Sequence, residues 1–293
     1  MKPRYIQAMQ GLGDTIYSRP FIKAAVARGE EVWLKTSWPQ LFQDLPVKCV
    51  SPGNVGLRTQ HKNINLAAAA CLYERPIRSV SWQSWHYVSQ PNISISAALN
   101  KGLPLGELDD WRLDLPQFPI AARTSGSRPY IIVRPCTIRS EWRADNRNCD
   151  PWYIKRAAEH LAADYQLVSV ADLDEGKEWA IDPFPKTDVQ FHRGELDLPA
   201  LMSLVQHAAA IVSPVGWAVP AALAARKPLL CIAGGQGGNN SPARLVDPRI
   251  DTGLIHWAMP DDYCRCKAWT HACNRKITNI DQHIEDWRRA NNL

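Results

Sequence analysis

One acidic residue stands where the first expected strand of the chain ends. Residues 5–9 form an apolar run that predicts a strand, and the turn at 10–14 leads into a helix expected over residues 15–28. In an open α/β sheet, ligands bind at the carboxyl ends of the strands. Asp14 could therefore act as a general base that removes a proton from an attacking hydroxyl. The alternative is structural, because Asp is also a preferred N-cap for a helix beginning at Thr15.

Basic side chains gather after a second apolar run, at residues 130–133. The stretch 134–147 contains Arg134, Arg139, Arg143 and Arg147, against only two acidic residues. Guanidinium groups form paired hydrogen bonds with phosphate oxygens. We expect Thr137 and Arg139 to contact the phosphates of a ligand, whereas Arg143 and Arg147 fit a solvated charged loop equally well.

A third group of candidates lies between residues 211 and 242. The pattern is a short apolar strand, a turn, an Ala-rich helix, a second apolar strand and a Gly-rich loop. The start of the helix offers free N–H groups and a dipole to an anion, and the loop backbone could approach a phosphate closely. The alternative for the loop is a structural connection that needs positive φ angles. The candidate residues for binding a phosphate-containing ligand are Gly13 near the first turn, Ser213, Gly216 and Trp217 in this turn, and Gly235, Gln236 and Gly237 in the loop.

Three cysteines and a histidine occur close together near the C-terminus, at Cys264, Cys266, His271 and Cys273. Thiolate and imidazole groups are the usual ligands of zinc. The spacing C-x-C-x6-C lacks the paired C-x2-C knuckles of common zinc sites, so we predict no metal here. Eight cysteines in 293 residues are also too few for a disulfide scaffold.

The elements that position these residues follow a regular alternation. A chain of 293 residues with 45% hydrophobic and 22% charged residues suits two globular domains. Strand and helix signals alternate through the second half, which predicts an α/β fold with a parallel, doubly wound sheet. Residues 121–129 contain no apolar run, so we predict a linker between domains at 1–125 and 126–276, followed by a C-terminal segment at 277–293.

Several local signals predict where individual elements begin and end. Asp150 before Pro151, and Asp197 before Pro199, are expected N-caps of helices. Residues 166–170 and 189–191 read as strands, and 47–50 and 64–66 as short strands. Ile280, Ile284 and Trp287 are spaced for one face of a helix over 277–290.

Charge and hydropathy restrict the classes of partner and compartment. The net charge of +5 fits an anionic small molecule as well as a nucleic acid. No apolar run approaches the roughly 20 residues that span a bilayer. The first residues lack the apolar core of a signal peptide, so we expect a cytoplasmic protein without a transmembrane segment.

Taken together, these motifs resemble glycosyltransferase family 9, the ADP-heptose:lipopolysaccharide heptosyltransferases. Residues 13–20 resemble the family's opening G-D-x-x-x-x-x-P, and residues 134–140 its donor-phosphate loop. Residues 201–225 resemble its helix, strand and D-T-G-x-x-H-L-A-A-A-L segment, 233–236 its G-P-T loop, and 273–277 its terminal C-x-x-x-I. The chain departs from the family at the donor site, where D-T-G becomes Pro214-Val215-Gly216 and the family's His becomes Val219.

The resemblance implies a GT-B fold, in which two Rossmann-like domains face a cleft. It implies that the second domain holds the donor nucleotide and that the last helix packs back on the first domain. It also implies that Asp14 is the catalytic base. This chain lacks the carboxylate, hydroxyl and imidazole of the family's donor motif. We therefore do not predict a heptose donor or a lipopolysaccharide acceptor.

The expected function is transfer of a sugar from a nucleotide-sugar to an acceptor hydroxyl, with inversion and without a metal. The nucleotide-sugar is a co-substrate, and no other cofactor is expected. The acceptor is a glycan or another hydroxyl compound. One alternative is the same chemistry on DNA or a modified base, and another is a noncatalytic nucleotide- or sugar-binding protein.

Overall fold

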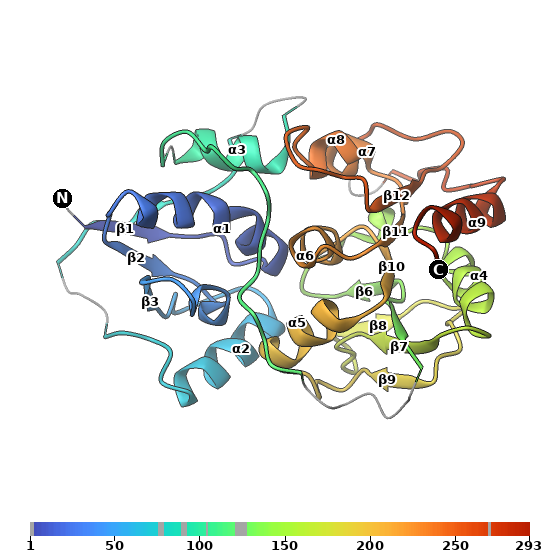
Figure 1. Cartoon of the computed structure of the whole chain (residues 1–293), viewed down its shortest axis with the longest axis horizontal. Coiled ribbons are helices and arrows are strands. Elements are labelled where there is room, and N and C mark those ends of the chain that lie inside the picture. Colours follow the sequence, from blue (N-terminus) through green and yellow to red (C-terminus); the bar gives the residue numbers. More distant parts are fainter. Residues whose placement is uncertain (1–2, 76–78, 89–92, 104, 121–127, 269–270) are drawn as a thin grey trace.

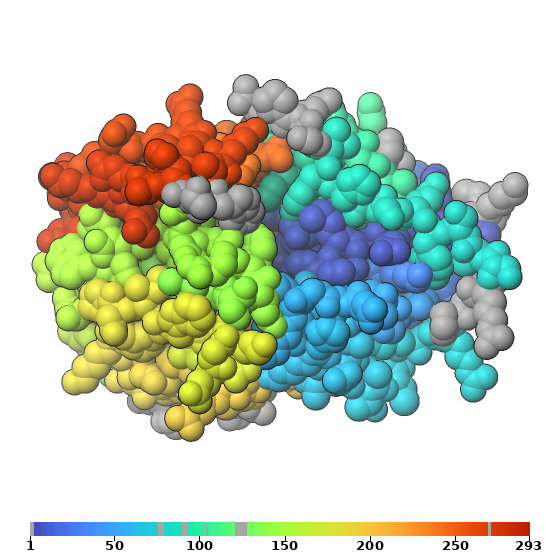
Figure 2. Space-filling view, turned by 180° about the vertical axis from the view of Figure 1, so that it is seen from behind, coloured from blue at the N-terminus to red at the C-terminus, as the bar shows by residue number. Residues whose placement is uncertain are grey.

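The computed structural model describes residues 3–75, 79–88, 93–103, 105–120, 128–268 and 271–293. Two parallel β-sheets lie side by side, each flanked by helices (Figure 1). Seen from behind, the two halves of the chain meet along one seam (Figure 2). The predicted domain boundary after residue 125 falls within 121–127, outside the described residues. None of the helices in the described part of the chain has the length and hydropathy needed to cross a bilayer.

The first sheet contains four parallel strands in the order β3-β2-β1-β4. Its strands are β1 (Arg4–Gln7), β2 (Val32–Lys35), β3 (Lys48–Val50) and β4 (Gln83–Ser84). The helices of this half are α1 (Leu12–Ala27), the 3-10 helix η1 (Pro39–Phe42), α2 (Arg58–Ala69) and α3 (Ile95–Gly102). The strand predicted at residues 64–66 is wrong, because these residues lie within α2. The buried face of α2 is Gln60, Asn63 and Ala67, so its helical repeat leaves little apolar signal in the sequence.

The second sheet contains six parallel strands in the order β12-β11-β10-β5-β7-β9. Numbered by their order along the chain, these strands run 6-5-4-1-2-3, the order of a dinucleotide-binding fold. The strands are β5 (Tyr130–Val133), β7 (Gln166–Val170), β9 (Val189–Phe191), β10 (Ala210–Pro214), β11 (Leu229–Ile232) and β12 (Ile255–Ala258). A separate antiparallel pair is formed by β6 (Thr137–Arg139) and β8 (Glu178–Ala180).

Helices cover this second sheet and close its ends. They are η2 (Asp145–Arg147), α4 (Pro151–Leu161), α5 (Leu198–His207), α6 (Ala218–Ala225), α7 (Gly237–Asn240), α8 (Pro242–Leu245) and α9 (Ile280–Ala290). Both predicted N-caps are confirmed: Asp150 accepts a hydrogen bond from the N–H of Trp152, and Asp197 from that of Ala200. Each cap satisfies an N–H group that the helix itself leaves unpaired.

The strand order decides where a ligand can bind. In the second sheet the order reverses between β5 and β10, and a crevice opens beyond the carboxyl ends of these strands. Arg134 directly follows β5, and Val215 and Gly216 directly follow β10. The chemistry-bearing residues of the second half therefore lie at the switch point of its sheet.

The two halves pack directly on each other. One cluster of buried apolar side chains includes Ile6 of the first half and Ile132 of the second. The first turn of α1 packs on α6, where a Cβ atom at Gly13 would lie 3.5 Å from the Cα of Trp217. Arg58 of α2 also forms ion pairs with acidic side chains of the second half, at 3.3 Å from Asp172. These contacts set the spacing between the facing sheet edges.

The C-terminal helix α9 packs on the second half, which corrects the expectation that it returns to the first domain. Ile280, Ile284 and Trp287 are buried in the same cluster as Ile131 and Leu230 of the second sheet. The helix lies beside α4 and β12 (Figure 1). The apolar face was identified correctly, but the pattern of one face does not identify the surface that it covers.

Replacing Ile284 by Ala should destabilise the second half. The side chain is fully buried, and removing it leaves a cavity that costs about 2–5 kcal/mol. The free energy of unfolding can be measured by urea denaturation followed by tryptophan fluorescence. Gln282→Ala, on the exposed face of the same helix, is the matched control and should change it by less than about 0.5 kcal/mol. Equal effects of both substitutions would contradict the packing of α9.

Candidate active site

A cavity of about 620 Å³ lies between the two halves. Its volume falls in the range of roughly 300–1,000 Å³ that is usual for small-molecule sites. The first half contributes the first turn of α1, part of α2 and Tyr87. The second half contributes the loop after β5, residues 215–217 after β10, and Gln236. The cavity therefore lies against the switch point of the second sheet.

Asp14 lies in the first turn of α1 and faces this cavity. The helix begins at Leu12 with Gly11 as its N-cap, so the alternative in which Asp14 caps the helix is wrong. The hydroxyl of Tyr87 donates a hydrogen bond to Oδ1 of Asp14. Burial raises the pKa of Asp14 from 3.8 to about 6, and the positive charge of Arg147 opposes part of this rise. A carboxylate with this pKa is a stronger base than one in water.

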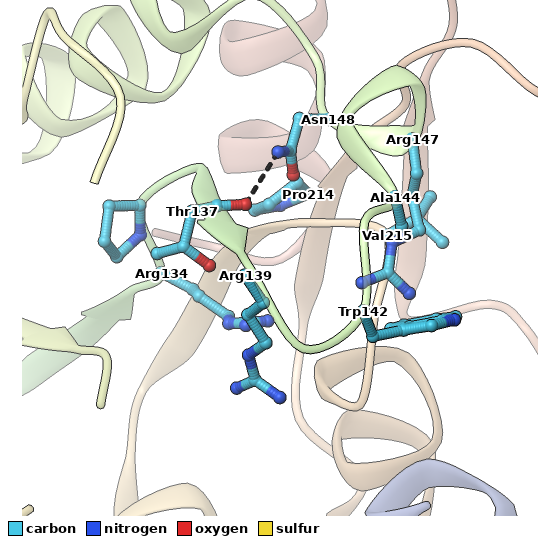
Figure 3. Close-up of a pocket in the computed structure, with 10 residues that line it drawn as sticks. Arg134, Thr137, Arg139, Trp142, Ala144, Arg147, Asn148, Pro214 and Val215 are labelled. Carbon is cyan, nitrogen blue, oxygen red and sulfur yellow. Dashed lines mark hydrogen bonds between the residues drawn. The ribbon is translucent and has the colours of Figure 1, made fainter. Parts of the chain in front are cut away.

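The side chains of Arg134, Arg139 and Arg147 converge on a pocket at the edge of the cavity, which we call the arginine pocket (Figure 3). Arg134 and Arg147 form no ion pair with a carboxylate of the described residues, and Nε of Arg147 is buried without a hydrogen-bond partner. Burial, together with the positive charge of the neighbouring guanidinium groups, lowers the pKa of both groups from 12.5 to about 10. Cationic groups that are buried without a partner are costly, so this pocket favours an anion.

Aromatic rings support the two unpaired guanidinium groups. Arg147 lies 4.6 Å from the centroid of the Trp142 ring (Figure 3). Arg134 lies 5.7 Å from the ring of Trp217. An aromatic face stabilises a cation without neutralising its charge. The positive charge of both arginines therefore remains available to a bound anion.

The third arginine, Arg139, already has an acidic partner. Its Nε lies 2.6 Å from Oε2 of Glu178, because the register of β6 and β8 places these two residues opposite each other. Glu178 is buried and also lies 3.7 Å from Arg58. Arg139 was predicted to contact phosphate, and the structure places it in the pocket with its charge partly neutralised.

From the sequence, a solvated loop was an equally good interpretation for Arg143 and Arg147, but the structure gives the two side chains different environments. Arg143 is exposed and pairs with Asp145, as expected for a solvated loop. Arg147 turns into the pocket beside Arg134 (Figure 3). Their positions relative to the 3-10 helix η2 explain the difference, because Arg143 precedes it and Arg147 is its last residue.

Other predicted donor-site residues divide into two groups. Gly13, Gly216 and Trp217 line the cavity, and Thr137 lines the arginine pocket. Ser213 does not reach either space, because it is fully buried in β10 and its hydroxyl donates to the carbonyl of Pro214 at 2.7 Å. The prediction of a ligand contact for Ser213 is corrected accordingly.

The Gly-rich loop mainly supports another loop. Gln236 lines the cavity, but Gly235 and Gly237 do not appear in its lining. The N–H of Gly235 donates to the carbonyl of Asn146 at 2.7 Å, and the N–H of Gly237 to that of Cys264 at 2.8 Å. These groups are not free for a phosphate, which favours the structural alternative. Close approach rather than positive φ requires the glycines, since the positive φ of this loop belongs to Gln236.

The predicted metal-free segment brings four ligand-type side chains together. The sulfur atoms of Cys264, Cys266 and Cys273 and a ring nitrogen of His271 all lie within 4.8 Å of one another. This cluster packs against the Gly-rich loop. We predicted no metal because the spacing of the cysteines along the chain is unusual, but the folded segment brings the four side chains together despite that spacing.

Tyr87 also belongs to the site, and no pattern in the sequence marks its contact with Asp14. It follows β4, a strand of two residues paired with β1. The pairing brings Tyr87 to the same sheet edge as Asp14. So short a strand leaves no readable alternation of polar and apolar residues, so the sequence offered no signal for this placement.

Comparison with known proteins shows similarity of fold. No family model matches the sequence, and no curated protein matches it. The iron-containing dodecameric heptosyltransferase TibC, solved with ADP-D-β-D-heptose and found in enterotoxigenic E. coli, has 15% identity and a TM-score of 0.60, covering 99% of this chain and 77% of its own. E. coli ADP-heptose lps heptosyltransferase II has 13% identity and a TM-score of 0.55, covering 97% and 99%. A family 9 glycosyltransferase from Veillonella parvula has 10% identity and a TM-score of 0.61, covering 99% and 98%.

These structures confirm the predicted GT-B fold and the resemblance to family 9 at the level of fold. The sequence identity is too low for the fold to carry residue roles with it. The roles of Asp14 and of the arginines therefore depend on the geometry of this site.

Asp14→Asn should change the pH dependence of stability. Folding raises the pKa of Asp14 from 3.8 to about 6, so the folded protein binds more protons than the unfolded chain between these values. Asp14 therefore lowers stability as the pH rises through this window, and the loss persists above it. The melting temperature of the Asn variant relative to the parent protein should rise from about pH 4 to 6 and then level off. A difference that is independent of pH would show that Asp14 titrates normally.

Proposed function

We propose that this protein is a glycosyltransferase that moves a sugar from a nucleotide-sugar to an acceptor hydroxyl, with inversion at the anomeric carbon. One observation carries the proposal. A carboxylate with a raised pKa faces the same interdomain cavity as two arginines that form no ion pair within the described part of the chain. The transfer needs one group that accepts a proton and another that stabilises the departing diphosphate.

Asp14 is suited to activate the acceptor. With a pKa of about 6 it is mostly ionised at neutral pH and still basic enough to accept a proton. Tyr87 donates a hydrogen bond to Oδ1 of the carboxylate, so the proposal assigns the acceptor's proton to Oδ2, which lies beside Gly11. The hydroxyl oxygen attacks the anomeric carbon, its proton passes to Asp14, and the bond to the diphosphate breaks.

The arginine pocket is suited to hold the leaving group. Negative charge develops on the diphosphate as the bond to the sugar breaks. Arg134 and Arg147 are preorganised for it, because no carboxylate of the described residues forms an ion pair with either of them. Thr137, Arg139 and the start of α6 at Gly216 complete the same surface. These groups can stabilise the diphosphate without a metal ion bridging its oxygens.

The number of available carboxylates supports inversion. The acidic residues that line the cavity in the described part of the chain are Asp14, Asp172 and Asp197. Asp172 is paired with Arg58, and Asp197 caps α5. A retaining reaction through a glycosyl-enzyme needs an additional nucleophile, so direct displacement with Asp14 as the base fits the site.

Both substrates are proposed by chemical class. TibC was solved with ADP-D-β-D-heptose, which supports a nucleoside diphosphate sugar as the donor here. The heptose is not carried over, since Val219 stands where the family has a His and is fully buried. On the acceptor side the lining includes Leu57, Leu66 and Ile95. This apolar wall fits a glycan or another hydroxyl compound better than DNA, whose binding depends on many phosphate contacts.

Arg147→Met should weaken binding of ADP more than binding of adenosine. Met retains most of the side-chain volume and removes the charge, so the loss should be about 1.5–3 kcal/mol for ADP alone. Isothermal titration calorimetry measures both ligands. Arg143→Met is the matched control, because its guanidinium lies outside the pocket and pairs with Asp145. Equal losses of ADP and adenosine affinity in the Arg147 variant would show that Arg147 does not contact phosphate.

Asp14→Asn should abolish most of the transfer activity while leaving donor binding intact. Asn retains the shape of Asp but cannot accept the proton, so the rate should fall about 10²–10⁴-fold. Release of nucleoside diphosphate from a panel of nucleotide-sugars and acceptors measures the rate. An Asn variant with full activity would remove Asp14 from the reaction. Donor binding by the parent protein without turnover across the panel would instead support a noncatalytic binding protein.

A further inference from the structure

Four side chains near the C-terminus form a cluster that the transfer reaction does not use. Sγ of Cys266 lies 3.5 Å from Sγ of Cys273. Nδ1 of His271 lies 3.5 Å from Sγ of Cys264 and 3.3 Å from Sγ of Cys273. All four ligand atoms lie within 4.8 Å of one another. Such convergence of thiols and an imidazole has no packing explanation, since three of the four side chains are only partly buried and His271 is exposed.

The distances match those expected around a single metal ion. A tetrahedral ion with metal–sulfur bonds of about 2.3 Å and metal–nitrogen bonds of about 2.0–2.1 Å separates its ligand atoms by about 3.5–3.8 Å. The three separations above, 3.3–3.5 Å, are close to this range. The set contains three thiols and one imidazole, which favours a thiophilic ion such as Zn²⁺ or Fe²⁺ over Mg²⁺ or Ca²⁺.

The Gly-rich loop supplies a second layer around the cluster. The N–H of Gln236 points to Sγ of Cys273 at 3.4 Å, a contact that suits a metal-bound thiolate. The N–H groups of Gly237 and Gly238 donate to the carbonyls of Cys264 and Cys266 at 2.8 and 2.9 Å. These bonds orient the backbone on both sides of the first two cysteines.

The glycines are required by this close approach. A Cβ atom at Gly235 would lie 2.2 Å from Cβ and 2.4 Å from Sγ of Cys273. A Cβ atom at Gly237 would lie 2.6 Å from the carbonyl oxygen of Cys264. Any larger residue would push the Cys-rich segment away from the loop. The glycines thus serve the cluster rather than a phosphate.

We propose that Cys264, Cys266, His271 and Cys273 bind one Zn²⁺ or Fe²⁺ ion, which clips the C-terminal segment onto the Gly-rich loop. The protein fills all four coordination positions, so the ion is structural and offers no open position to a substrate. The clip holds Gln236, which lines the interdomain cavity, through its bond to Cys273. The ion thereby shapes one wall of the cavity without taking part in the transfer.

Metal content tests the proposal directly and does not depend on the transfer reaction. The full chain is expressed with added zinc and iron, purified under reducing conditions and analysed by inductively coupled plasma mass spectrometry. About one ion per chain is expected, and Cys264→Ser and Cys273→Ser should lose most of it. Cys71→Ser is the matched control, because Cys71 is an exposed free cysteine outside the cluster, and it should keep the ion. Absence of metal from the parent protein would overturn the proposal.

Thiol chemistry and spectroscopy cover the case in which the cysteine variants do not fold. Cobalt added to the reduced, metal-depleted parent protein should produce the visible absorption of tetrahedral thiolate coordination at about one equivalent. Peptide mapping without reduction that shows a Cys266–Cys273 disulfide in freshly purified protein would overturn the site, as would failure to take up cobalt.

A glycine substitution tests the link between the clip and the cavity. Gly235→Ala should lower metal content several-fold and weaken ADP binding, because the added methyl group overlaps Cys273. Gly56→Ala is the control, since a Cβ atom there meets nothing within 4 Å. A Gly235 variant with full metal content would refute the proposed packing. Lost metal with unchanged ADP affinity would refute the link to the cavity but leave the metal site in place.

Discussion

Buried positive charge that has no acidic partner among the described residues is the constraint on which the rest of the site depends. Arg134 and Arg147 are held at the switch point of a parallel sheet, where the backbone opens a crevice between β5 and β10. Indole rings, not carboxylates, lie against their guanidinium groups. A buried cation is tolerated only if something compensates it. In the proposed function a bound diphosphate supplies that compensation, and the charge of Arg147 keeps the pKa of Asp14 from rising further.

The first half of the chain supplies the complementary chemistry at a fixed separation. Asp14 cannot be positioned by its own sheet alone, because the distance that matters runs across the cavity to the second half. Packing of α1 on α6 sets this distance, and the absence of a side chain at Gly13 lets the two helices approach. The ion pair between Arg58 and Asp172 fixes the opposite side of the seam. Interdomain packing therefore aligns Asp14, the proposed base, with the pocket of arginine side chains.

Elements with strong local signals could be predicted from the sequence, whereas contacts between distant segments could not. Asp150 and Asp197 mark helix starts because capping is local, and 166–170 was recognised because a buried parallel strand is continuously apolar. The parallel, doubly wound sheet followed from this alternation of strands and helices, and the GT-B fold from the resemblance to family 9. Arg147 could not be distinguished from Arg143, since only the turn of η2 directs one inward. The contact of Tyr87 with Asp14, the packing of α9 on the second half, and the convergence of the cysteines with His271 all depend on tertiary contacts. No local sequence pattern encodes such contacts.

Because β6 and β8 form an antiparallel pair, the number of residues in each strand determines which side chains face the site. Alternation along a strand places Thr137 and Arg139 on one face and Ile138 on the other, with Arg139 opposite Glu178. Inserting or deleting one residue within either strand would turn Ile138 toward the arginine pocket and move Arg139 away from it. The turn at 140–144, between β6 and η2, is held in a different way, because the ring of Trp142 within it lies against the guanidinium group of Arg147. Homologous chains that keep this chemistry should therefore keep the length of both strands.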